Sequence, residues 1–439
     1  MNKFLCNFIC GFIPSKKLRH NFRECCNIKK AEIVKIFTLP DSIVKMNIEN
    51  LELKTKKNIN NKILLIYPIN FLKNNAGNNS YVFNIVKLLK DMDFKIDFLS
   101  SDKFIKDDFN NFEELNKKCK FIDNLYLGKF ETSNKNIYAK NSWVDDQLIN
   151  LFQEVIDKNN YSYILSNYIN FSDLFRFSEI DKNTKIINIM HDCDTMQRFF
   201  SKNNYDNIGY DFEEEVKLLQ YYDDILCISN DEKYIFEKFY KNKNFYWLPH
   251  FGEFKKTENT EKDIDCLFIG YNNPYNFNSI IWFFEKVYPL FNKKVNLTIC
   301  GKVGNMLKNK NPDIYKQMIK NNVSFIDFAE SLDDLYSRTK IAIVPMFDGT
   351  GLKVKTITAM SYGIPVVGTC AAVDGFADKN ENPCLITNNP KEFANYIEKL
   401  LYDKKFYKDK SEEIEEYFNK YFSIENAKKT LLNIFKNKN

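Results

Sequence analysis

The stretch IAIVPMFDGTGLKVKTITAMSYGIPVVGT, from Ile341 to Thr369, decides the fold of this chain. It opens with IAIVPM, a continuous apolar run typical of a buried parallel strand. The turn Asp348–Gly351 leads into a helix predicted over 352–362, and PVVGT at 365–369 is the next buried strand. Strand, helix and strand in this order predict one unit of a doubly wound α/β sheet.

The same alternation continues on both sides of this segment. In the C-terminal half, the predicted strands lie at 266–270, 296–301, 323–328, 341–346 and 365–369, and the predicted helices at 278–292, 331–338, 352–362, 390–403 and 411–437. In the N-terminal half, the predicted strands lie at 62–69, 94–100, 161–167, 185–191, 224–229 and 245–250, and the predicted helices at 80–92, 143–158, 211–222 and 231–240. The pattern predicts two doubly wound α/β domains in succession.

A linker rich in charge and asparagine, GEFKKTENTEKDID (252–265), separates the two halves. We predict a basic amphipathic leader over 1–58, an N-terminal Rossmann-like domain over 59–252 and a C-terminal Rossmann-like domain over 253–439. The last helix of the C-terminal domain could cross back to the first domain. Ligands of such sheets bind outside the carboxyl ends of the strands, so the predicted site is a central cleft that both domains face.

The composition is that of a globular protein, with 439 residues of which 44% are hydrophobic and 28% charged. The formal net charge of +5 comes from residues 1–57, which hold twelve Lys/Arg against five Asp/Glu, and the remainder is near neutral. This distribution implies no basic groove, and no nucleic-acid-binding motif occurs. Eleven cysteines without a CxxC pair indicate the reduced thiols of a cytoplasmic protein, and three histidines argue against a zinc site.

Residues 1–30 combine an apolar stripe with a basic run. Apolar side chains recur at helical spacing between Phe4 and Ile13, and basic residues follow over 16–23. This pattern is typical of a segment on an anionic membrane surface, and it predicts peripheral attachment to the inner face of the cytoplasmic membrane. The alternative is a helix that packs on the protein body. No stretch approaches the roughly 20 apolar residues of a membrane span.

The turn before the 352–362 helix has the features of an anion site. Gly349 and Gly351 would let a ligand approach the backbone, and the free amides of a helix N-terminus attract negative charge. Lys353 and Lys355 have the wrong sign for the helix dipole, so an anion such as a diphosphate would compensate them. A turn with a purely structural role is the alternative.

This stretch resembles the donor-binding segment of family 4 glycosyltransferases, the group 1 enzymes of bacterial surface-polysaccharide synthesis that have the GT-B fold. Their pattern is approximately P-x-x-x-G-T-G-L-K-x-K-x-x-E-A-M-x-x-G-x-P-V-V-x-T. The matching residues here are Pro345, Gly349, Thr350, Gly351, Leu352, Lys353, Lys355, Ala359, Met360, Gly363, Pro365, Val366, Val367 and Thr369. The likeness is strong over 265–376. Upstream it is weaker and rests on the Gly77 loop, on His191 and on the segment EEEVKLLQYYDDILCISNDEKYIFE.

The resemblance implies a retaining hexosyltransferase. Such an enzyme moves a sugar from a UDP- or GDP-linked donor to a hydroxyl of a saccharide or lipid-linked acceptor, and it requires no metal or other cofactor. By resemblance, His191 is the catalytic residue, placed at the end of the strand KIINIM, where we expect it to face the cleft. By resemblance, the donor and its nucleotide are bound by Gly77, Gly349, Thr350, Gly351, Leu352, Lys353, Lys355 and Thr358.

One departure from the family pattern leaves alternatives open. The family has a glutamate before Ala-Met, where this chain has Thr358. A threonine hydroxyl carries no charge, so a non-catalytic, transferase-like scaffold is one alternative, and a nucleotide-sugar epimerase of the same architecture is another. Asp192 and Asp194 form a DxD, which binds a metal in GT-A transferases, but the rest of the chain does not have the GT-A pattern.

Overall fold

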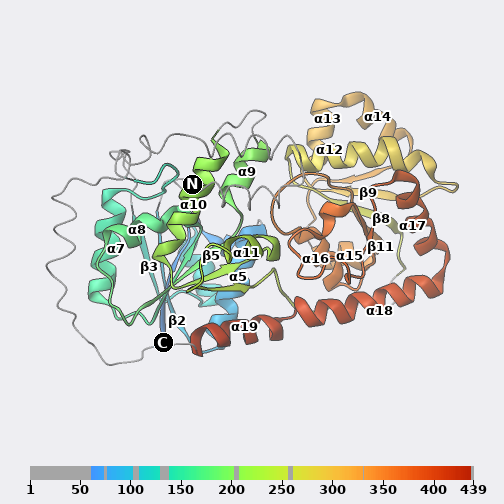
Figure 1. Ribbon diagram of the computed structural model, residues 1–439. Helices are drawn as coiled ribbons and strands as arrows, with labels where there is room; N and C mark the ends of the chain where they lie inside the picture. Colours follow the sequence, from blue (N-terminus) through green and yellow to red (C-terminus); the bar gives the residue numbers. More distant parts are fainter. Residues whose placement is uncertain are drawn as a thin grey trace. The chain divides into compact units, whose positions relative to one another are not determined.

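The computed structural model describes residues 61–73, 77–101, 108–128, 138–201, 207–255, 261–329 and 331–436. The leader predicted over 1–58 lies outside the described residues. The described chain forms two compact units, each with its own sheet (Figure 1). Unit 1 comprises the chain up to Cys227 together with Tyr234–Tyr246, and unit 2 comprises Ile228–Lys233 and the chain from Trp247.

Unit 1 is a sheet with the strand order β3-β2-β1-β4-β5-β6-β7. Neighbouring strands from β3 to β6 pair in parallel. The strands are β1 (Lys62–Ile66), β2 (Lys95–Ser101), β3 (Asn124–Gly128), β4 (Tyr163–Asn167), β5 (Lys185–Met190), β6 (Asp224–Cys227) and β7 (Asn244–Trp247). The helices are α5 (Gly77–Asp91), α6 (Phe112–Cys119), α7 (Asp146–Lys158), α8 (Ser172–Phe177), α9 (Asp194–Ser201), α10 (Ile208–Leu218) and α11 (Asn230–Phe236), of which α11 begins in the segment that clusters with unit 2.

The central strands of unit 1 are buried on both faces because helices cover the sheet. The last four residues of β1, ILLI, are fully buried, as expected for a parallel strand. On one face, α7 packs Leu148, Phe152 and Val155 into a cluster with residues of β1 and β4. These three side chains lie on one side of the helix because their spacing follows its 3.6-residue period.

Unit 2 has the strand order β10-β9-β8-β11-β12-β13, and all neighbours pair in parallel. The strands are β8 (Ile264–Ile269), β9 (Leu297–Cys300), β10 (Ser324–Ile326), β11 (Thr339–Val344), β12 (Val366–Gly368) and β13 (Leu385–Ile386). The helices are α12 (Pro274–Trp282), α13 (Val303–Lys310), α14 (Pro312–Lys320), α15 (Leu332–Ser337), α16 (Val354–Ser361), α17 (Pro390–Tyr402), α18 (Lys404–Tyr421) and α19 (Ile424–Lys436). The core of this unit packs the sheet against α12 and α17.

Each sheet reverses its strand order at one place, between β1 and β4 in unit 1 and between β8 and β11 in unit 2. In open α/β sheets, ligands bind beside the carboxyl ends of the strands at such a switch point. Gly77 and His191 follow β1 and β5, and the 349–353 turn follows β11. The predicted class, two doubly wound Rossmann-like units, is therefore confirmed.

Some element predictions were wrong, and β3, β13, α6, α8 and α9 were not predicted at all. The helix predicted over 411–437 is two helices, α18 and α19, which part at Phe422 and Ser423. The region between β9 and β10, for which no helix was predicted, holds α13 and α14. In the described part of the chain, the helices are all too short or too polar to pass through a bilayer.

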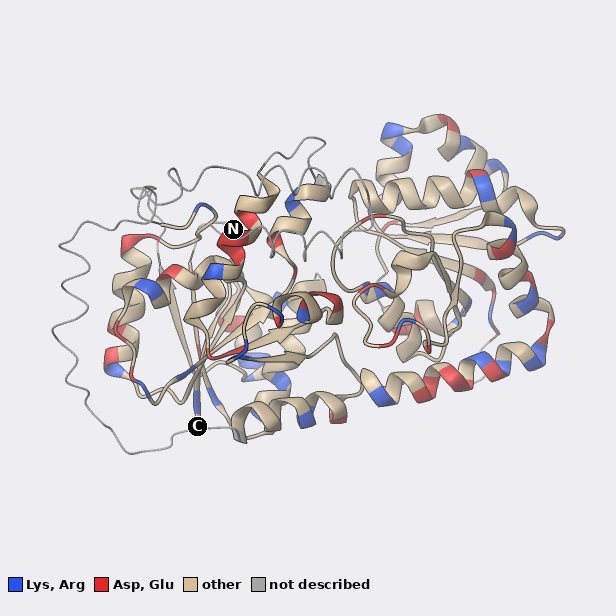
Figure 2. Ribbon diagram, viewed as in Figure 1, with Lys and Arg blue, Asp and Glu red and all other residues tan. Residues whose placement is uncertain are grey.

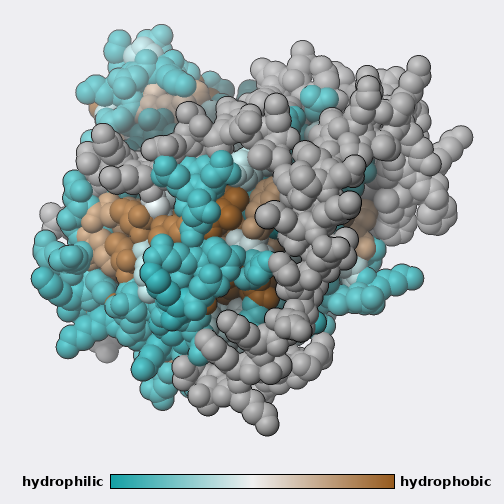
Figure 3. Space-filling view, turned by 90° about the vertical axis from the view of Figure 1, so that its left-hand side faces the viewer, coloured by the Kyte–Doolittle hydropathy of each residue, from teal (hydrophilic) through white to brown (hydrophobic). Residues whose placement is uncertain are grey.

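Basic and acidic residues are distributed over both units, and α18 carries residues of both signs (Figure 2). Figure 3 views unit 1 from the side on which α7 lies in Figure 1 and shows apolar side chains between hydrophilic ones. Among the described apolar side chains of unit 1, Leu127 of the edge strand β3 is 42% exposed.

Candidate functional site

The loop after β11 contains the glycine turn that the sequence singled out. It runs from Pro345 to Lys353, and α16 begins at Val354, later than predicted. Gly349 and Gly351 have φ angles of +105° and +67°. Residues with a Cβ rarely adopt such angles, so the turn depends on glycine at both positions. The backbone amides ahead of α16 therefore sit in a turn that lacks two side chains.

Lys353 closes this turn on itself. Its Nζ donates hydrogen bonds to the carbonyl oxygens of Gly349 at 3.1 Å, of Thr350 at 3.3 Å and of Gly351 at 3.1 Å. The same Nζ lies 3.8 Å from Oδ2 of Asp374, and the Lys353 residue is only 5% exposed. A buried ammonium needs such compensation. Lys353 thus stands at the N-cap of α16 and brings a positive charge to its first amides.

Lys355, two residues further on, points elsewhere. Its Nζ donates to Oδ1 of Asn276 on α12 at 2.5 Å and lies 4.8 Å from the centre of the Phe268 ring of β8. Burial, with a smaller effect from the nearby Lys353, lowers the pKa of Lys355 to about 7. Lys355 therefore connects α16 with α12 and with β8, one of the two strands at the switch point of unit 2.

Thr358 and Leu352 serve the packing of α16. The Thr358 hydroxyl donates to the carbonyl oxygen of Val354 on the same helix at 2.9 Å, so in this structure it is engaged locally. Leu352 is 9% exposed and lies against the backbone of Gly375, where an added Cβ would come within 3.0 Å of the Leu352 Cδ1. Thr358 thus has Val354 as its partner, and Leu352 has Gly375.

In unit 1, His191 directly follows β5 and is buried, with 3% of its surface exposed. Its Nε2 lies 2.9 Å from Oδ1 of Asn167, and the Asn167 Nδ2 donates to the carbonyl oxygen of Ile66. Because the second bond fixes the orientation of the amide, Nε2 carries a proton and donates to Asn167. The imidazole is also stacked on Tyr168, with ring centres 4.3 Å apart and planes 16° apart.

Tyr168 connects His191 with the first turn of α5. Its hydroxyl accepts a hydrogen bond from Nδ2 of Asn78 at 2.8 Å, and its φ angle is +65°, which is uncommon outside glycine. Gly77 is the first residue of α5 and is exposed; residues 74–76 of the preceding loop lie outside the described residues. The structure therefore brings Gly77 and His191, the two predicted site residues of unit 1, into one cluster through Asn78 and Tyr168.

The sequence prediction missed Asn167 and Tyr168. Both lie at the carboxyl end of β4, directly after the buried run YILS. A polar residue at the end of a buried parallel strand is a general sign of a site, and this sign was present in the sequence. Their contact with His191 was not predictable in the same way, because it requires that β4 and β5 be neighbours in the sheet.

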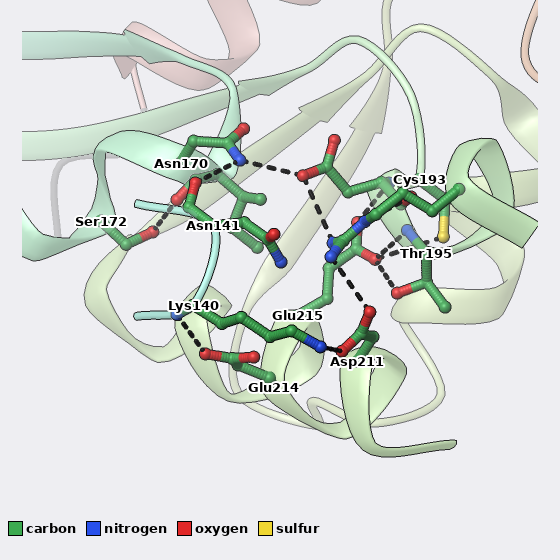
Figure 4. Close-up of polar contacts among 12 residues, drawn as sticks. Lys140, Asn141, Asn170, Ser172, Cys193, Thr195, Asp211, Glu214 and Glu215 are labelled. Atoms are coloured by element: carbon green, nitrogen blue, oxygen red, sulfur yellow. Dashed lines mark hydrogen bonds and ion pairs between the residues drawn. The ribbon is translucent and has the colours of Figure 1, made fainter. Parts of the chain in front are cut away.

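The DxD at Asp192 and Asp194 takes part in protein contacts. The Asp194 Oδ2 accepts a hydrogen bond from Nδ2 of Asn170 at 2.9 Å and lies 3.6 Å from an Arg198 guanidinium nitrogen (Figure 4). Within the described ranges, no three His, Cys, Asp or Glu side chains gather in a way that could hold a metal ion. Asp194 is thus part of the polar network around α9.

Comparison with known proteins identifies unit 2. Residues 263–403 match the family described as "Glycosyl transferases group 1". This part of unit 2 is therefore similar to the glycosyltransferases of that family. The predicted resemblance is confirmed by this match, which spans the glycine turn and α16. The match covers this part of unit 2, from β8 to the end of α17.

One curated relative matches a longer part of the chain. It is described as "Uncharacterized 44.6 kDa protein in cps region", from Klebsiella pneumoniae. The two are 24% identical over 257 residues, which is 54% of this chain and 64% of the relative. The match thus covers just under two thirds of the relative's length.

Solved structures share the fold over most of this chain. Sucrose-phosphate synthase from Thermosynechococcus elongatus has a TM-score of 0.62 at 14% identity, covering 85% of this chain and 98% of that one. A TarM variant from S. aureus, in complex with Fondaparinux, α-GlcNAc-glycerol and UDP, has a TM-score of 0.61 at 13% identity, with 85% and 99% covered. HepE from Anabaena, in complex with UDP, has a TM-score of 0.61 at 12% identity, with the same coverage. These likenesses confirm the predicted two-domain GT-B fold.

Proposed function

We propose that this protein transfers a sugar from a nucleotide-diphosphate donor, UDP- or GDP-linked, to a hydroxyl of a saccharide or lipid-linked acceptor in the synthesis of a cell-surface polysaccharide. The group 1 domain supports the transfer of a sugar from a nucleotide sugar. The UDP complexes of two structural neighbours, TarM and HepE, support the donor class, and the cps-region relative supports the polysaccharide. The retaining outcome rests on the resemblance to family 4.

The observation that carries this proposal is the Gly349–Lys353 turn at the carboxyl end of β11. Two glycines in the left-handed region leave backbone amides without side-chain cover, directly ahead of a helix N-terminus. Lys353 holds a positive charge against the same turn. Fixed amides and an adjacent ammonium would stabilise the charge that develops on the diphosphate leaving group, without rearrangement and without a metal ion.

His191 remains the residue of unit 1 that we propose to contact the donor sugar or the acceptor. With a proton on Nε2 that is donated to Asn167, the ring has a fixed tautomer and a fixed plane. A group held in this way contributes by position, because it loses little freedom when the substrate binds. Gly77 and Asn78, at the N-terminus of α5, would meet the sugar from the same cluster.

A titration with nucleotide sugars tests the proposal. Full-length protein is titrated in a calorimeter with UDP-, GDP-, ADP- and CMP-linked sugars, and then incubated with the best donor and a glycan acceptor. We expect saturable binding of a UDP- or GDP-sugar and acceptor-dependent release of the nucleoside diphosphate. An epimerase would interconvert the donor sugar without an acceptor. A scaffold that lacks the family glutamate would catalyse neither epimerisation nor sugar transfer.

We also propose that residues 1–30 attach the enzyme to the cytoplasmic face of an anionic membrane. The support is the sequence alone, an apolar stripe followed by a basic run. Attachment would bring the acceptor site to a lipid-linked saccharide. It is independent of the transfer reaction, and the two proposals can fail separately.

A further inference from the structure

We propose that Glu215 is a positioning residue that holds the turn of His191 in place for the transfer reaction. The proposal rests on the proposed function, in which His191 contacts substrate. Glu215 lies on α10, more than twenty positions away from His191 in the chain. Its effect would pass through the backbone of residues 193–195, which links His191 to α9.

The Glu215 carboxylate binds four donors from three consecutive residues (Figure 4). One oxygen accepts from the backbone N–H of Asp194 at 2.9 Å. The other accepts from the N–H of Thr195 at 3.0 Å, from its hydroxyl at 2.7 Å and from the Cys193 thiol at 3.4 Å. Glu215 is 3% exposed, so these donors would lose their hydrogen-bond acceptor without access to water if the carboxylate were removed. The carboxylate thus caps the first turn of α9 from another helix.

The opposite side of the same turn is tied to β4. Asn167 binds the His191 ring, and Asn170, three residues further on, donates through Nδ2 to the Asp194 carboxylate at 2.9 Å. The same amide also donates to the carbonyl oxygen of Asn141. The stretch from His191 to Asp194 is therefore held by β4 on one side and by α10 on the other. Loss of either side would let the imidazole shift relative to Tyr168.

The acidic run at 213–215 shows that this role is specific to one of three neighbours. Glu213 forms an ion pair with Lys217 one turn along α10. Glu214 accepts from the backbone N–H of Lys140 at 2.9 Å and is 9% exposed. Only Glu215, among these three, has recorded bonds to residues 193–195. Glu214 is therefore a matched control: it too is a buried carboxylate on α10 that accepts a backbone hydrogen bond.

The surroundings of Glu215 make ionisation of its carboxyl group costly. Burial, and to a smaller extent the charge of Asp194, raise the pKa of Glu215 to about 7, while the bonds from Thr195 and Asp194 oppose the rise. Four donors around one carboxyl group have most to gain when it is ionised. Glutamine keeps the shape but turns one acceptor oxygen into an amide donor, which would face N–H and O–H groups.

The test observes His191 directly. Full-length protein is labelled with ¹³C at histidine Cε1. The chain has three histidines, His20, His191 and His250, so His191→Gln and His250→Gln assign their signals. Wild type is compared with Glu215→Gln, Glu215→Asp and the control Glu214→Gln. kcat and KM for the donor are measured on the same samples.

We expect Glu215→Gln to move or broaden the His191 signal while the His250 signal stays in place, and to lower kcat roughly ten- to a hundredfold with KM changed less than about twofold. Glu215→Asp keeps the charge and should recover part of both effects, and Glu214→Gln should match wild type. If circular dichroism shows that Glu215→Gln does not fold, Glu215→Asp decides alone. A His191 signal that matches wild type in the folded variants would overturn the proposal, even if α9 is destabilised. If no donor is turned over by wild type, the proposed function fails, and the spectrum still decides whether Glu215 positions His191.

Discussion

Lys353 and Lys355 differ in role because the chain passes from a turn into a helix between them. Before the helix, Lys353 can fold back on the carbonyl oxygens of the turn, and its charge stays beside the free amides. Inside the first turn of α16, Lys355 is directed instead toward Asn276. The sequence placed both lysines in one anion site. The structure leaves Lys353 as the stronger candidate for a diphosphate contact.

Removal of the Lys353 ammonium should weaken donor binding. We expect Lys353→Ala to reduce the affinity for the nucleotide sugar by about 1–3 kcal/mol, the scale of one charge-assisted hydrogen bond. Calorimetric titration with the best donor measures the change, and circular dichroism checks that the variant is folded. Lys355→Ala should cost less. An affinity equal to that of wild type would remove Lys353 from the site.

The lowered pKa of Lys355 predicts how the stability of the protein changes with pH, and this prediction does not depend on any substrate. Its folded-state pKa of about 7 lies below the unfolded value near 10.5, so between these values the unfolded state binds more protons. Stability then rises with pH in this range, and the penalty for burying the ammonium is fully present below pH 7. Relative to Lys355→Met, wild type should gain thermal stability between pH 7 and pH 9. A difference in Tm that is constant with pH would contradict the lowered pKa.

Thr358 tests whether the family glutamate is needed here. Thr358→Glu gives up one hydroxyl bond to Val354 within α16 and restores a charged acceptor. If the chain is an active transferase, we expect the variant to bind the donor at least as tightly as wild type, since a carboxylate can accept from ribose or sugar hydroxyls. Thermal shift with the donor makes the comparison. Clearly weaker binding by the variant would mean that the pocket has adapted to threonine.

At the scale of elements, apolar runs located the buried strands well, because parallel strands covered on both faces are continuous apolar runs. The helices α13 and α14 were missed although their signals are present. Val303, Met306 and Leu307 are buried at helical spacing, and Asn311 caps α14. Both helices are rich in Lys and Asn, which are common throughout the chain, and the helical spacing of the few apolar residues was therefore not recognised.

The break between α18 and α19 has a local cause. Ser423 accepts through its hydroxyl oxygen from the N–H of Asn426 at 3.2 Å, as an N-cap does. The preceding Phe422 is fully buried, so the chain turns there to keep its ring in the core.

The candidate site was predicted less completely than the fold. Residues of one contiguous motif were found, whereas Tyr168 and Glu215 required knowledge of which elements are neighbours.

The cap of α7 offers a test of how one helix contributes to unit 1. The Asp145 carboxylate accepts from the N–H of Leu148 at 2.8 Å and is 1% exposed. Asp145→Ala leaves that N–H without its acceptor, and we expect a loss of about 1–2 kcal/mol in the free energy of unfolding. Asp145→Asn keeps an acceptor and should lose less. Urea unfolding followed by circular dichroism measures both; equal losses would point to the charge rather than the cap.

At the scale of the whole molecule, the distribution of charge separates the leader from the two units. Residues 1–30 hold seven Lys/Arg against one acid, whereas residues beyond 57 are near neutral. A positive segment beside an apolar stripe gains free energy at an anionic leaflet, roughly 1 kcal/mol for each basic residue near the surface. Membrane attachment should therefore depend on the leader and on salt.

Vesicle co-sedimentation tests this dependence. We expect full-length protein to pellet with vesicles that contain anionic lipid at low salt, and to be released as salt screens the basic residues. A chain that begins at Asn58 should stay in the supernatant, and so should full-length protein with neutral vesicles. A leader in which the basic residues of 16–23 are replaced by glutamine keeps the apolar stripe and should bind weakly, which separates the charge from the apolar contribution. Equal sedimentation of the full-length and shortened chains would exclude the leader as the anchor, and it would leave the donor titration and the His191 spectrum unaffected, because both concern the described units.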